Sequence, residues 1–398
     1  MVQVKDLTEL TLEDLWREVK WQSEDWWEKI EASQLRVVKM ILESSLEEEL
    51  VAQLQAGRYQ RVKSRRSYRN GHYERNFFTK YGVIKALRVP RSRESYPSEV
   101  MPRYKRRQEQ VNKMIREMFL RGVSTRGVNE VMAVMGGGKV SPQTVSRVVR
   151  SLDREVELFW QRPLADIYQY LFLDGIGLKV KGSVERQKRQ VLCAYGIRRD
   201  GKREIISFRQ SSGESEAKWA AFLNDLYNRG LTGQQVRLIT TDGCPGLHQA
   251  LDTVYPYVNR QRCWAHKLRN VANKLPKRDQ KDCIKGAALI YQAENKREAI
   301  KRYREWESQW QQKHPRAVSC LEKDLDELLS FLDAPAEHRV KVRTTNVIER
   351  SFREVRRRTR PMSCFTNTAS VNRIIYGVIS HLNHHWKENP LPKFTQAC

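Results

Sequence analysis

The chain contains 398 residues, of which 40% are hydrophobic and 30% charged, and its formal net charge at pH 7 is +26. This length is sufficient for about two or three domains, each with its own hydrophobic core. The absence of an apolar run of about 18 residues excludes a membrane-spanning helix, and the first residues lack the basic-then-apolar order of a signal peptide. The seven scattered cysteines favour free thiols in a reducing compartment. These features predict a cytoplasmic protein.

The positive charge is concentrated outside the first part of the chain. Residues 1–50 hold 13 acidic and 6 basic residues, whereas residues 58–107 hold 16 Lys and Arg against 3 acidic residues. A short basic run is usually a solvated surface, but a segment of this length and density favours a polyanionic partner, because neutralising phosphates releases their counterions. An anionic membrane surface is the alternative, and no basic amphipathic helix supports it. Nucleic acid is therefore the expected partner.

The N-terminal region is predicted to be helical. Apolar residues recur at helical spacing over residues 8–55, which predicts two acidic amphipathic helices. The second helix carries its apolar side chains before an acidic LEEEL sequence: Leu35, Val38, Met40, Ile41 and Leu42. We interpret this region as a capping or self-association element.

A basic β-hairpin is predicted next. Two short β-rich runs, Asn76–Thr79 and Val83–Val89, flank a Tyr81-Gly82 turn. Such a two-stranded ribbon is suited to lie against the phosphates of DNA. The arginines expected to contact these phosphates flank the hairpin on both sides: Arg65, Arg66, Arg69, Arg91 and Arg93.

After the hairpin the pattern becomes helical. Apolar residues at helical spacing mark three helices: Val111, Met114, Ile115, Met118 and Phe119; Val128, Val131, Met132 and Met135; and Val145, Val148, Val149 and Leu152. Ser141-Pro142 supplies an N-cap and a favoured first residue for the third helix. The last two helices resemble a helix-turn-helix whose second helix would expose four polar residues to DNA: Gln143, Thr144, Arg147 and Arg150. A plain helical hairpin is the alternative, and the basic context favours DNA contact.

Residues 168–265 change to strand patterns. Three β-rich runs separated by turns are followed by a helix, a buried strand, a short helix and a further strand, VNRQRCWAH. The order β-β-β-α-β-α-β, with three antiparallel strands before crossover units, is that of a ribonuclease-H-like fold, in which the first and fourth strands are neighbours. The chain after Lys267 is helical and predicts an all-α insertion, with Trp306 and Trp310 packing its helices, before a last helix of the core.

The expected fold class is α/β, with a ribonuclease-H-like mixed-sheet core preceded by helical and β-hairpin regions that bind DNA. The expected regions are residues 1–57 (helical), 58–110 (basic hairpin), 111–160 (helix-turn-helix-like), 161–266 (first part of the core), 267–340 (all-α insertion) and 341–398 (final core helices).

Two aspartates follow buried strands of this core. Asp174 ends the apolar run LFLD, Asp242 ends LITTD, and a glycine follows each. Because a glycine lets the chain turn, such carboxylates project at the rim of a sheet, where a ligand reaches them. A single Asp-Gly after a strand more often satisfies backbone donors in a turn. Two of them, on strands expected to be neighbours, predict a pair of functional carboxylates.

Glu349 is the candidate for a third carboxylate. It lies in VKVRTTNVIERSFREVRRRTR, a segment rich in Lys and Arg, beside the apolar stripe of a predicted helix. Taken alone, Glu349 is best explained as an ion-pair partner of Arg353, one helical turn away. Three carboxylates together suit Mg²⁺, which also takes substrate phosphate as a ligand. Arginines of the segment would then neutralise DNA phosphates beside the site: Arg353, Arg356 and Arg357.

Five segments, in this order, resemble the Mutator-like transposases of bacterial insertion sequences: RNGHYERNFFTKYGVIKALRVPRSR, YLFLDGIGLKVKG, LITTDGCPGL, RCWAHKLRN and TTNVIERSFREVRRRTRPM. The resemblance covers roughly residues 35–385. It implies a ribonuclease-H-like DDE catalytic core with an α-helical insertion between the second Asp and the Glu. Carried over position by position, the three catalytic, metal-binding residues are Asp174, Asp242 and Glu349.

The resemblance also places Cys263, His266 and Asn346 beside the active site. Cys263-x-x-His266 is half of a zinc site, but the usual second close-spaced pair is absent. A structural or DNA-contacting role is therefore favoured over a metal site. Trp264, between them, is expected to be buried, with stacking on an unpaired base as the alternative.

These expectations combine into one function, a DNA transposase that binds the terminal inverted repeats of its own insertion sequence. With two Mg²⁺ ions per active site, for which Mn²⁺ substitutes, it would hydrolyse a phosphodiester and transfer the freed 3′-OH to target DNA. Because two DNA ends must be brought together, a homodimer or larger assembly is expected. A repressor that keeps the fold without the chemistry, and a nuclease without strand transfer, are the alternatives.

Overall fold

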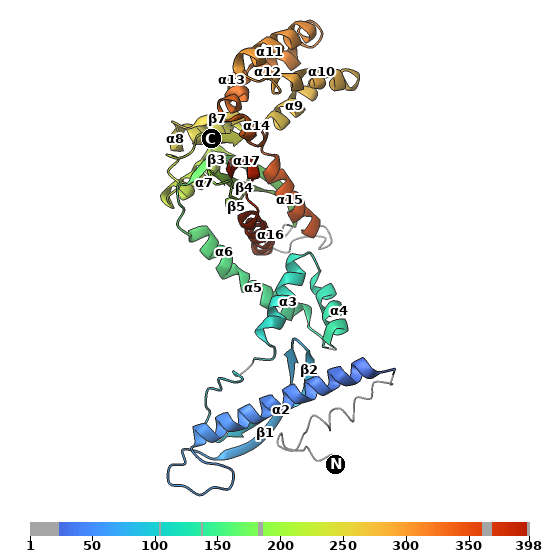
Figure 1. Cartoon of the computed structure of the whole chain (residues 1–398), viewed down its shortest axis with the longest axis vertical. Coiled ribbons are helices and arrows are strands. Elements are labelled where there is room, and N and C mark those ends of the chain that lie inside the picture. The colour runs from blue at the N-terminus through green and yellow to red at the C-terminus, as the bar shows by residue number, and fades with distance from the viewer. Residues whose placement is uncertain (1–23, 103–104, 137, 182–185, 360–367, 396–398) are drawn as a thin grey trace. The chain divides into compact units, whose positions relative to one another are not determined.

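The computed structural model describes residues 24–102, 105–136, 138–181, 186–359 and 368–395. The chain divides into two compact units, Met1–Val149 and Arg150–Cys398, each with its own hydrophobic core (Figure 1). The first of the two helices expected at the N-terminus lies outside the described residues. None of the described helices is both long and apolar enough to span a membrane.

In the first unit a long helix, α2 (Trp26–Leu54), covers a β-hairpin formed by β1 (Arg69–Thr79) and β2 (Gly82–Ser92). The core between them consists of Leu46, Phe77, Ile84, Leu87, Val89 and Met101, with Leu35, Val38 and Leu42 partly buried against it. Ile41, which the sequence placed among the apolar residues of this helix, is half exposed. The apolar stripe of α2 therefore packs within the unit, on the hairpin.

The hairpin has the predicted turn, although both strands are longer than expected. β1 and β2 pair antiparallel, with Thr79 opposite Gly82. The Thr79 hydroxyl donates to the Gly82 carbonyl oxygen and accepts a hydrogen bond from the Tyr81 amide. Gly82 has a φ of 134°, which favours glycine. The need for glycine at this position explains why Tyr81-Gly82 marked the turn in the sequence.

Three helices follow the hairpin: α3 (Glu109–Leu120), α4 (Thr125–Gly136) and α5 (Pro142–Arg150). The Ser141 hydroxyl accepts a hydrogen bond from the Thr144 amide at 3.2 Å, which confirms the predicted cap of α5. The predicted stripe of α4 is only half right. Val128 and Met132 are buried, whereas Val131 and Met135 are exposed. The buried face of the helix is therefore narrower than the sequence pattern suggests.

A five-stranded mixed sheet forms the centre of the second unit: β3 (Tyr168–Lys181), β4 (Arg186–Arg198), β5 (Arg203–Ser211), β6 (Leu238–Thr241) and β7 (Asn259–Arg262). The strand order is β5-β4-β3-β6-β7. β3, β4 and β5 are antiparallel neighbours, and β6 and β7 run parallel to β3. The predicted succession of strands is confirmed, and the first and fourth strands are neighbours.

Helices pack on both faces of this sheet. Leu171 and Leu173 of β3 share a core with α7 (Glu216–Asn228) and α8 (Pro245–Val254). Because side chains alternate along a strand, Tyr170 points to the opposite face, where it contacts helices from the end of the chain. The two helices that Tyr170 contacts are α14 (Ala336–Val342) and α17 (Pro392–Thr395). Two further helices pack against β3 and β5, respectively: α15 (Asn346–Thr359) and α16 (Thr368–Glu388).

Between β7 and α14 the described chain is helical, as expected for the insertion: α9 (Trp264–Ala272), α10 (Lys277–Ile290), α11 (Lys296–Trp310), α12 (Pro315–Glu322), α13 (Leu325–Leu329) and the 3-10 helix η1 (Ser330–Asp333). Trp306 and Trp310 are buried on α11, which confirms their packing role. The expected strand VNRQRCWAH is too long, since β7 ends at Arg262. Its partner β6 ends at Thr241, and the chain then turns into α9 at Cys263.

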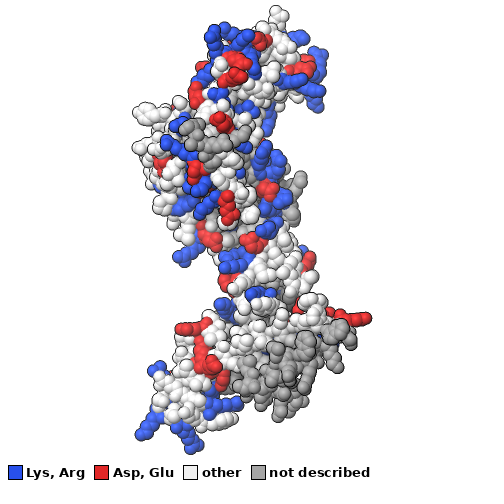
Figure 2. All heavy atoms as spheres, in the orientation of Figure 1, with Lys and Arg blue, Asp and Glu red and all other residues white. Residues whose placement is uncertain are grey.

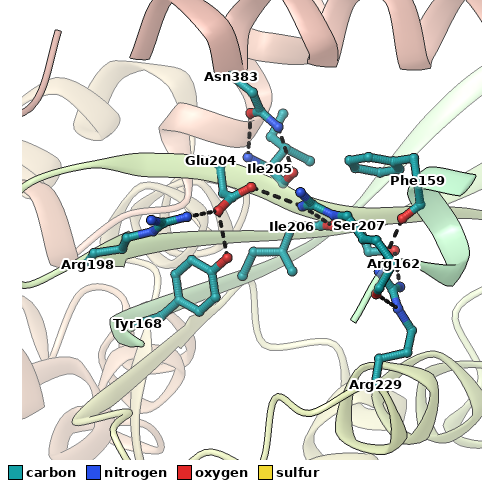
Figure 3. A network of polar contacts seen from close by, with 10 residues as sticks. All are labelled: Phe159, Arg162, Tyr168, Arg198, Glu204, Ile205, Ile206, Ser207, Arg229 and Asn383. Atoms are coloured by element: carbon teal, nitrogen blue, oxygen red, sulfur yellow. Dashed lines mark hydrogen bonds and ion pairs between the residues drawn. The ribbon is translucent and has the colours of Figure 1, made fainter. Parts of the chain in front are cut away.

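A polar network ties the edge of the sheet to the end of α6 (Leu152–Gln161) (Figure 3). The Glu204 carboxylate on β5 accepts hydrogen bonds from the Tyr168 hydroxyl at 2.7 Å, from Arg162 at 3.0 Å and from Arg198. Burial would raise the pKa of Glu204, but these three donors outweigh it and hold the pKa below its usual value. The carboxylate is therefore charged and fully engaged.

Replacing Glu204 by Gln is expected to destabilise the protein by about 1–3 kcal/mol, because two half-buried guanidinium groups lose their counter-charge. Urea unfolding measures the change. The matched control is Asp200→Asn, which breaks an exposed ion pair with Lys202 and should change the stability by less than about 0.5 kcal/mol. Equal effects of the two substitutions would show that the network does not stabilise the sheet edge.

Candidate active site

Asp174 and Asp242 lie at the same edge of the parallel part of the sheet. β3 runs on to Lys181, so Asp174 lies within a strand and not at its end, contrary to the prediction. Its parallel partner β6 stops at Thr241, which pairs with Leu173. Asp174 is therefore the first residue of β3 beyond the end of β6, and Asp242 is the first residue after that end. The predicted convergence of the two aspartates rests on this parallel pairing.

The Asp174 side chain is almost completely buried, with 2% of the residue exposed. Its Oδ2 atom accepts no hydrogen bond from the residues that the structure describes. Burial raises the pKa of Asp174 to about 7, the charge of Asp242 adds to the rise, and His266 and the Thr345 hydroxyl oppose it. A buried carboxylate oxygen without a partner is unfavourable. A proton or a cation bound to Oδ2 would remove this unfavourable contribution.

Asp242 occupies the turn after β6. Its Oδ1 atom accepts a hydrogen bond from the Cys244 amide at 3.0 Å, so one oxygen has the backbone-satisfying role expected of an Asp-Gly turn. Gly243 has a φ of 88°, a left-handed value that favours glycine and confirms the predicted turn. The Arg262 guanidinium packs beside this glycine and donates to its carbonyl oxygen at 3.0 Å. The turn thus fixes the Asp242 carboxylate next to the sheet.

Glu349 reaches the same region from α15, which packs against β3. The helix is anchored by the predicted apolar stripe, which is fully buried: Ile348, Phe352 and Val355. Glu349 Oε1 lies 3.2 Å from His266 Nε2 and 3.6 Å from Arg269 Nη2, both on α9. These tertiary partners take the place of the local ion pair expected with Arg353. The charge of Glu349 also raises the pKa of Asp174, as that of Asp242 does.

Cys263 and His266 surround the side chain of Thr345, the residue before α15. The Thr345 amide and hydroxyl donate to Cys263 Sγ at 3.3 and 3.6 Å, and the hydroxyl lies 3.4 Å from His266 Nδ1. The interaction with Cys263 raises the pKa of His266 to about 9 against the effect of burial, and Asp174 and Asp242 add to the rise. Burial would raise the pKa of Cys263, but His266 and the Thr345 amide lower it.

The remaining predicted neighbours of the site lie on helices. Asn346 is the first residue of α15 and is partly buried. Trp264 is buried, as expected, and its Nε1 donates to the Leu328 carbonyl oxygen at 2.7 Å. Cys263-x-x-His266 begins α9 and does not form a strand. Among the described residues, no second pair of ligands joins these two to make a zinc site.

A fourth carboxylate, that of Glu214, lies beside this site and was missed in the sequence. It belongs to the loop between β5 and α7, and a Cβ atom at Gly175 would meet its Oε1 atom at 1.6 Å. Cys244 Sγ donates to the Glu214 carbonyl oxygen at 3.4 Å, so the loop contacts the turn of Asp242. Burial and the charge of Asp242 raise the pKa of Glu214. Gly175 does not form the predicted turn but leaves room for this carboxylate, and a glycine within a strand was the available signal.

The donor set fits a divalent cation in part. Asp174 and Asp242 offer the hard oxygen ligands that Mg²⁺ prefers, and Asp174 Oδ2 has a free lone pair. In the described part of the chain, however, no three Asp, Glu, His or Cys side chains are gathered closely enough to hold an ion. Glu349 Oε1 faces His266 and Arg269, which leaves the other oxygen of this carboxylate to face a cation.

The residues expected to contact DNA in the first unit differ in their surroundings. Arg69 forms an ion pair with Glu47 of α2, and Arg65 donates to the Gly57 carbonyl oxygen at 3.4 Å. Thr144 is partly buried in the cap of α5. Five of these residues are exposed: Arg66, Arg91, Arg93, Gln143 and Arg147. Figure 2 shows Lys and Arg side chains gathered at the loop end of this unit, beyond the C-terminal end of α2.

The arginines of α15 lie on the exposed side of that helix. Arg353, Arg356 and Arg357 are exposed, and basic side chains lie along α15 in Figure 2. Arg357 forms an ion pair with Glu354 at 3.0 Å, and Arg356 Nη2 donates to the Gly177 carbonyl oxygen at 3.4 Å. The helix that carries Glu349 thus presents a basic surface next to the carboxylates.

The sequence matches the family described as Transposase, Mutator family, over residues 15–389. It is 33% identical over 353 residues to the transposase for insertion sequence element ISRM5 of Rhizobium meliloti, covering 88% of each chain. It is also 33% identical over 359 residues to the transposase for insertion sequence element IS256 in transposon Tn4001 of Staphylococcus aureus, covering 88% of this chain and 90% of the relative. The transposase for insertion sequence element IS406 of Burkholderia multivorans is 33% identical over 354 residues, with the same coverage. The chain belongs to the Mutator family of transposases.

Proposed function

We propose that this transposase binds the terminal inverted repeats of its own insertion sequence and uses Asp174, Asp242 and Glu349 to cut and rejoin DNA. The observation that carries the proposal is the parallel pairing of β3 with β6, which puts Asp174 and Asp242 at the same edge of the sheet. The charge of Glu349, on α15, also acts on Asp174. The strand order β5-β4-β3-β6-β7, with helices on both faces, supports a ribonuclease-H-like core of the DDE type.

The chemistry proposed for this site is phosphodiester hydrolysis followed by attack of the freed 3′-OH on a second phosphodiester. Two Mg²⁺ ions, or Mn²⁺ in their place, would supply an activated water and stabilise the leaving oxygen. Asp174 presents its free Oδ2 atom, and Asp242 presents a carboxylate held in place by the Cys244 amide. Glu349 would complete the donor set with the carboxylate oxygen that does not face His266. The exposed arginines of α15 neutralise the DNA phosphates beside these acids.

Two surfaces of the first unit are proposed to hold the repeat DNA. The exposed arginines beside the hairpin would contact phosphates, and the exposed face of α5 would reach the edges of the bases. Because two DNA ends must meet, we further propose a homodimer or larger assembly as the active form, acting in the cytoplasm.

A strand-transfer assay tests this function. The purified protein is incubated with Mg²⁺, end-labelled DNA that carries the inverted repeats flanking its gene, and an unlabelled target. We expect a cut product with a free 3′-OH, followed by a longer product in which that end is joined to the target. Cutting without joining would identify a nuclease, and repeat binding without cutting would identify a repressor.

A further inference from the structure

Thr345 lies where β3, α9 and α15 meet. It is fully buried, at 0% exposure, and its carbonyl oxygen accepts a hydrogen bond from the Ile348 amide at 2.9 Å in the first turn of α15. A polar side chain at this depth needs partners. The hydroxyl lies 3.6 Å from Cys263 Sγ and 3.4 Å from His266 Nδ1. One hydroxyl thus contacts both residues of the C-x-x-H motif.

The contacts of the His266 ring define which way it faces. Nδ1 faces the Thr345 hydroxyl, while Nε2 lies 3.2 Å from Glu349 Oε1. An imidazole with one nitrogen held by a hydrogen bond presents the other nitrogen in a fixed direction. Cys263 also interacts with this ring. The Thr345 hydroxyl and Cys263 thus both contact the imidazole whose other nitrogen faces Glu349.

Cys263 anchors this arrangement to the sheet. Its Sγ atom accepts a hydrogen bond from the Thr345 amide at 3.3 Å, and its own amide donates to the Thr241 carbonyl oxygen at 2.8 Å. Thr241 is the last residue of β6 and directly precedes Asp242. The contacts of Cys263 thus connect the start of α15 to the strand end that carries the second carboxylate.

We propose that the Thr345 hydroxyl is a positioning group that orients His266 and thereby sets the location of the Glu349 carboxylate relative to Asp174. The proposal rests on the proposed function and adds to it a residue outside the carboxylate trio. It also assigns a role to the Cys263-x-x-His266 motif. Cys263 holds Thr345 next to the end of β6, and His266 holds the Glu349 carboxylate.

Two substitutions separate the hydroxyl from the bulk of the side chain. Thr345→Val keeps the shape and removes the hydroxyl, whereas Thr345→Ser keeps the hydroxyl. Neither affects the bond from the Thr345 amide to Cys263 Sγ. Loss of a group that orients a metal ligand typically lowers affinity or activity about 10–100-fold. We expect Thr345→Val to lower both the cutting rate and the Mn²⁺ affinity of the DNA-bound protein by about this factor, and Thr345→Ser to keep most of both.

A double-mutant cycle shows whether Thr345 acts through His266. In a His266→Ala background, Thr345→Val should have little further effect on either quantity, because the contact is already lost. The matched control is Thr344→Val, the same chemical change at the preceding, partly exposed position, which should leave the rate and the Mn²⁺ affinity unchanged. If valine prevents folding, Thr345→Ala removes the hydroxyl in the same cycle.

The possible results separate this proposal from the function on which it rests. Equal losses in Thr345→Val and Thr345→Ser, or a valine effect of full size in the His266→Ala background, would overturn the positioning role. The positioning role would also be overturned if Thr345→Val kept the wild-type cutting rate and Mn²⁺ affinity while Asp242→Asn was inactive. Cutting that survives Asp242→Asn would instead reject the proposed catalytic site itself.

Discussion

Asp242→Asn is expected to lower the rate of Mg²⁺-dependent DNA cutting by about a thousandfold or more, which corresponds to about 4 kcal/mol of transition-state stabilisation. The asparagine keeps an oxygen that can accept the hydrogen bond from the Cys244 amide, so the turn after β6 should persist. What is lost is a negative charge beside Asp174 and an anionic ligand for a cation. Single-turnover cutting of labelled inverted-repeat DNA measures the rate.

Two variants make this prediction specific. Asp252→Asn removes an exposed carboxylate of α8 that pairs with Arg260, and it should cut at the wild-type rate. Asp242→Cys replaces the hard oxygen ligand by a softer thiolate, so it should be inactive with Mg²⁺ and regain part of the rate with Mn²⁺. A wild-type rate for Asp242→Asn would remove this residue from the active site.

Asp174→Asn is expected to make the metal-free protein more stable than wild type above pH 7, while the two should be nearly equal near pH 4. Burial raises the pKa of Asp174 to about 7 in the folded protein, whereas the unfolded chain has a value of about 3.9. Between these values the folded state retains a proton that the unfolded state has released. The stability of the wild type therefore falls as the pH rises from about 4 to 7, by up to about 4 kcal/mol. Asparagine does not titrate and avoids this loss.

Urea unfolding at pH 5 and pH 8, with a chelator present, measures the difference. Asp252→Asn, which removes an exposed carboxylate of α8, serves as the control. Added Mg²⁺ should raise the melting temperature of the wild type at pH 8 and leave that of Asp174→Asn unchanged. If the free energy of unfolding of Asp174→Asn differed from that of the wild type by the same amount at both pH values, the raised pKa of the buried Asp174 carboxyl would be contradicted.

The parts of the fold that the sequence predicted depend on local patterns. The apolar runs that became β3 to β6, the turn at Gly82 and the cap at Ser141 each follow from residues close together in the chain. The neighbouring positions of β3 and β6 followed from the order of the elements. The location of Asp174 within its strand did not, because β3 is extended by pairing with β4, which places Asp174 opposite Cys193, and a run ending in Asp-Gly does not reveal such a partner.

The contacts that the sequence missed are long-range ones. Helical spacing offered Arg353 as the partner of Glu349, but the tertiary contacts with His266 and Arg269 are the ones formed. Cys263 was expected in a strand because its neighbours are β-rich, yet the end of β6 stops the pairing one residue earlier. Thr345 reaches its sulfur partner 82 residues away in the chain. No periodicity or spacing encodes contacts of this kind.

The proposed catalytic site is tested most directly by a titration with Mn²⁺ of the protein bound to inverted-repeat DNA, followed by electron paramagnetic resonance. We expect about two ions per active site in the wild type. Asp174→Ala and Asp242→Asn should bind Mn²⁺ weakly, and Glu349→Gln should bind about one ion fewer than the wild type. An unchanged number of ions with unchanged affinity in all three variants would contradict the claim that these carboxylates form one metal-binding active site.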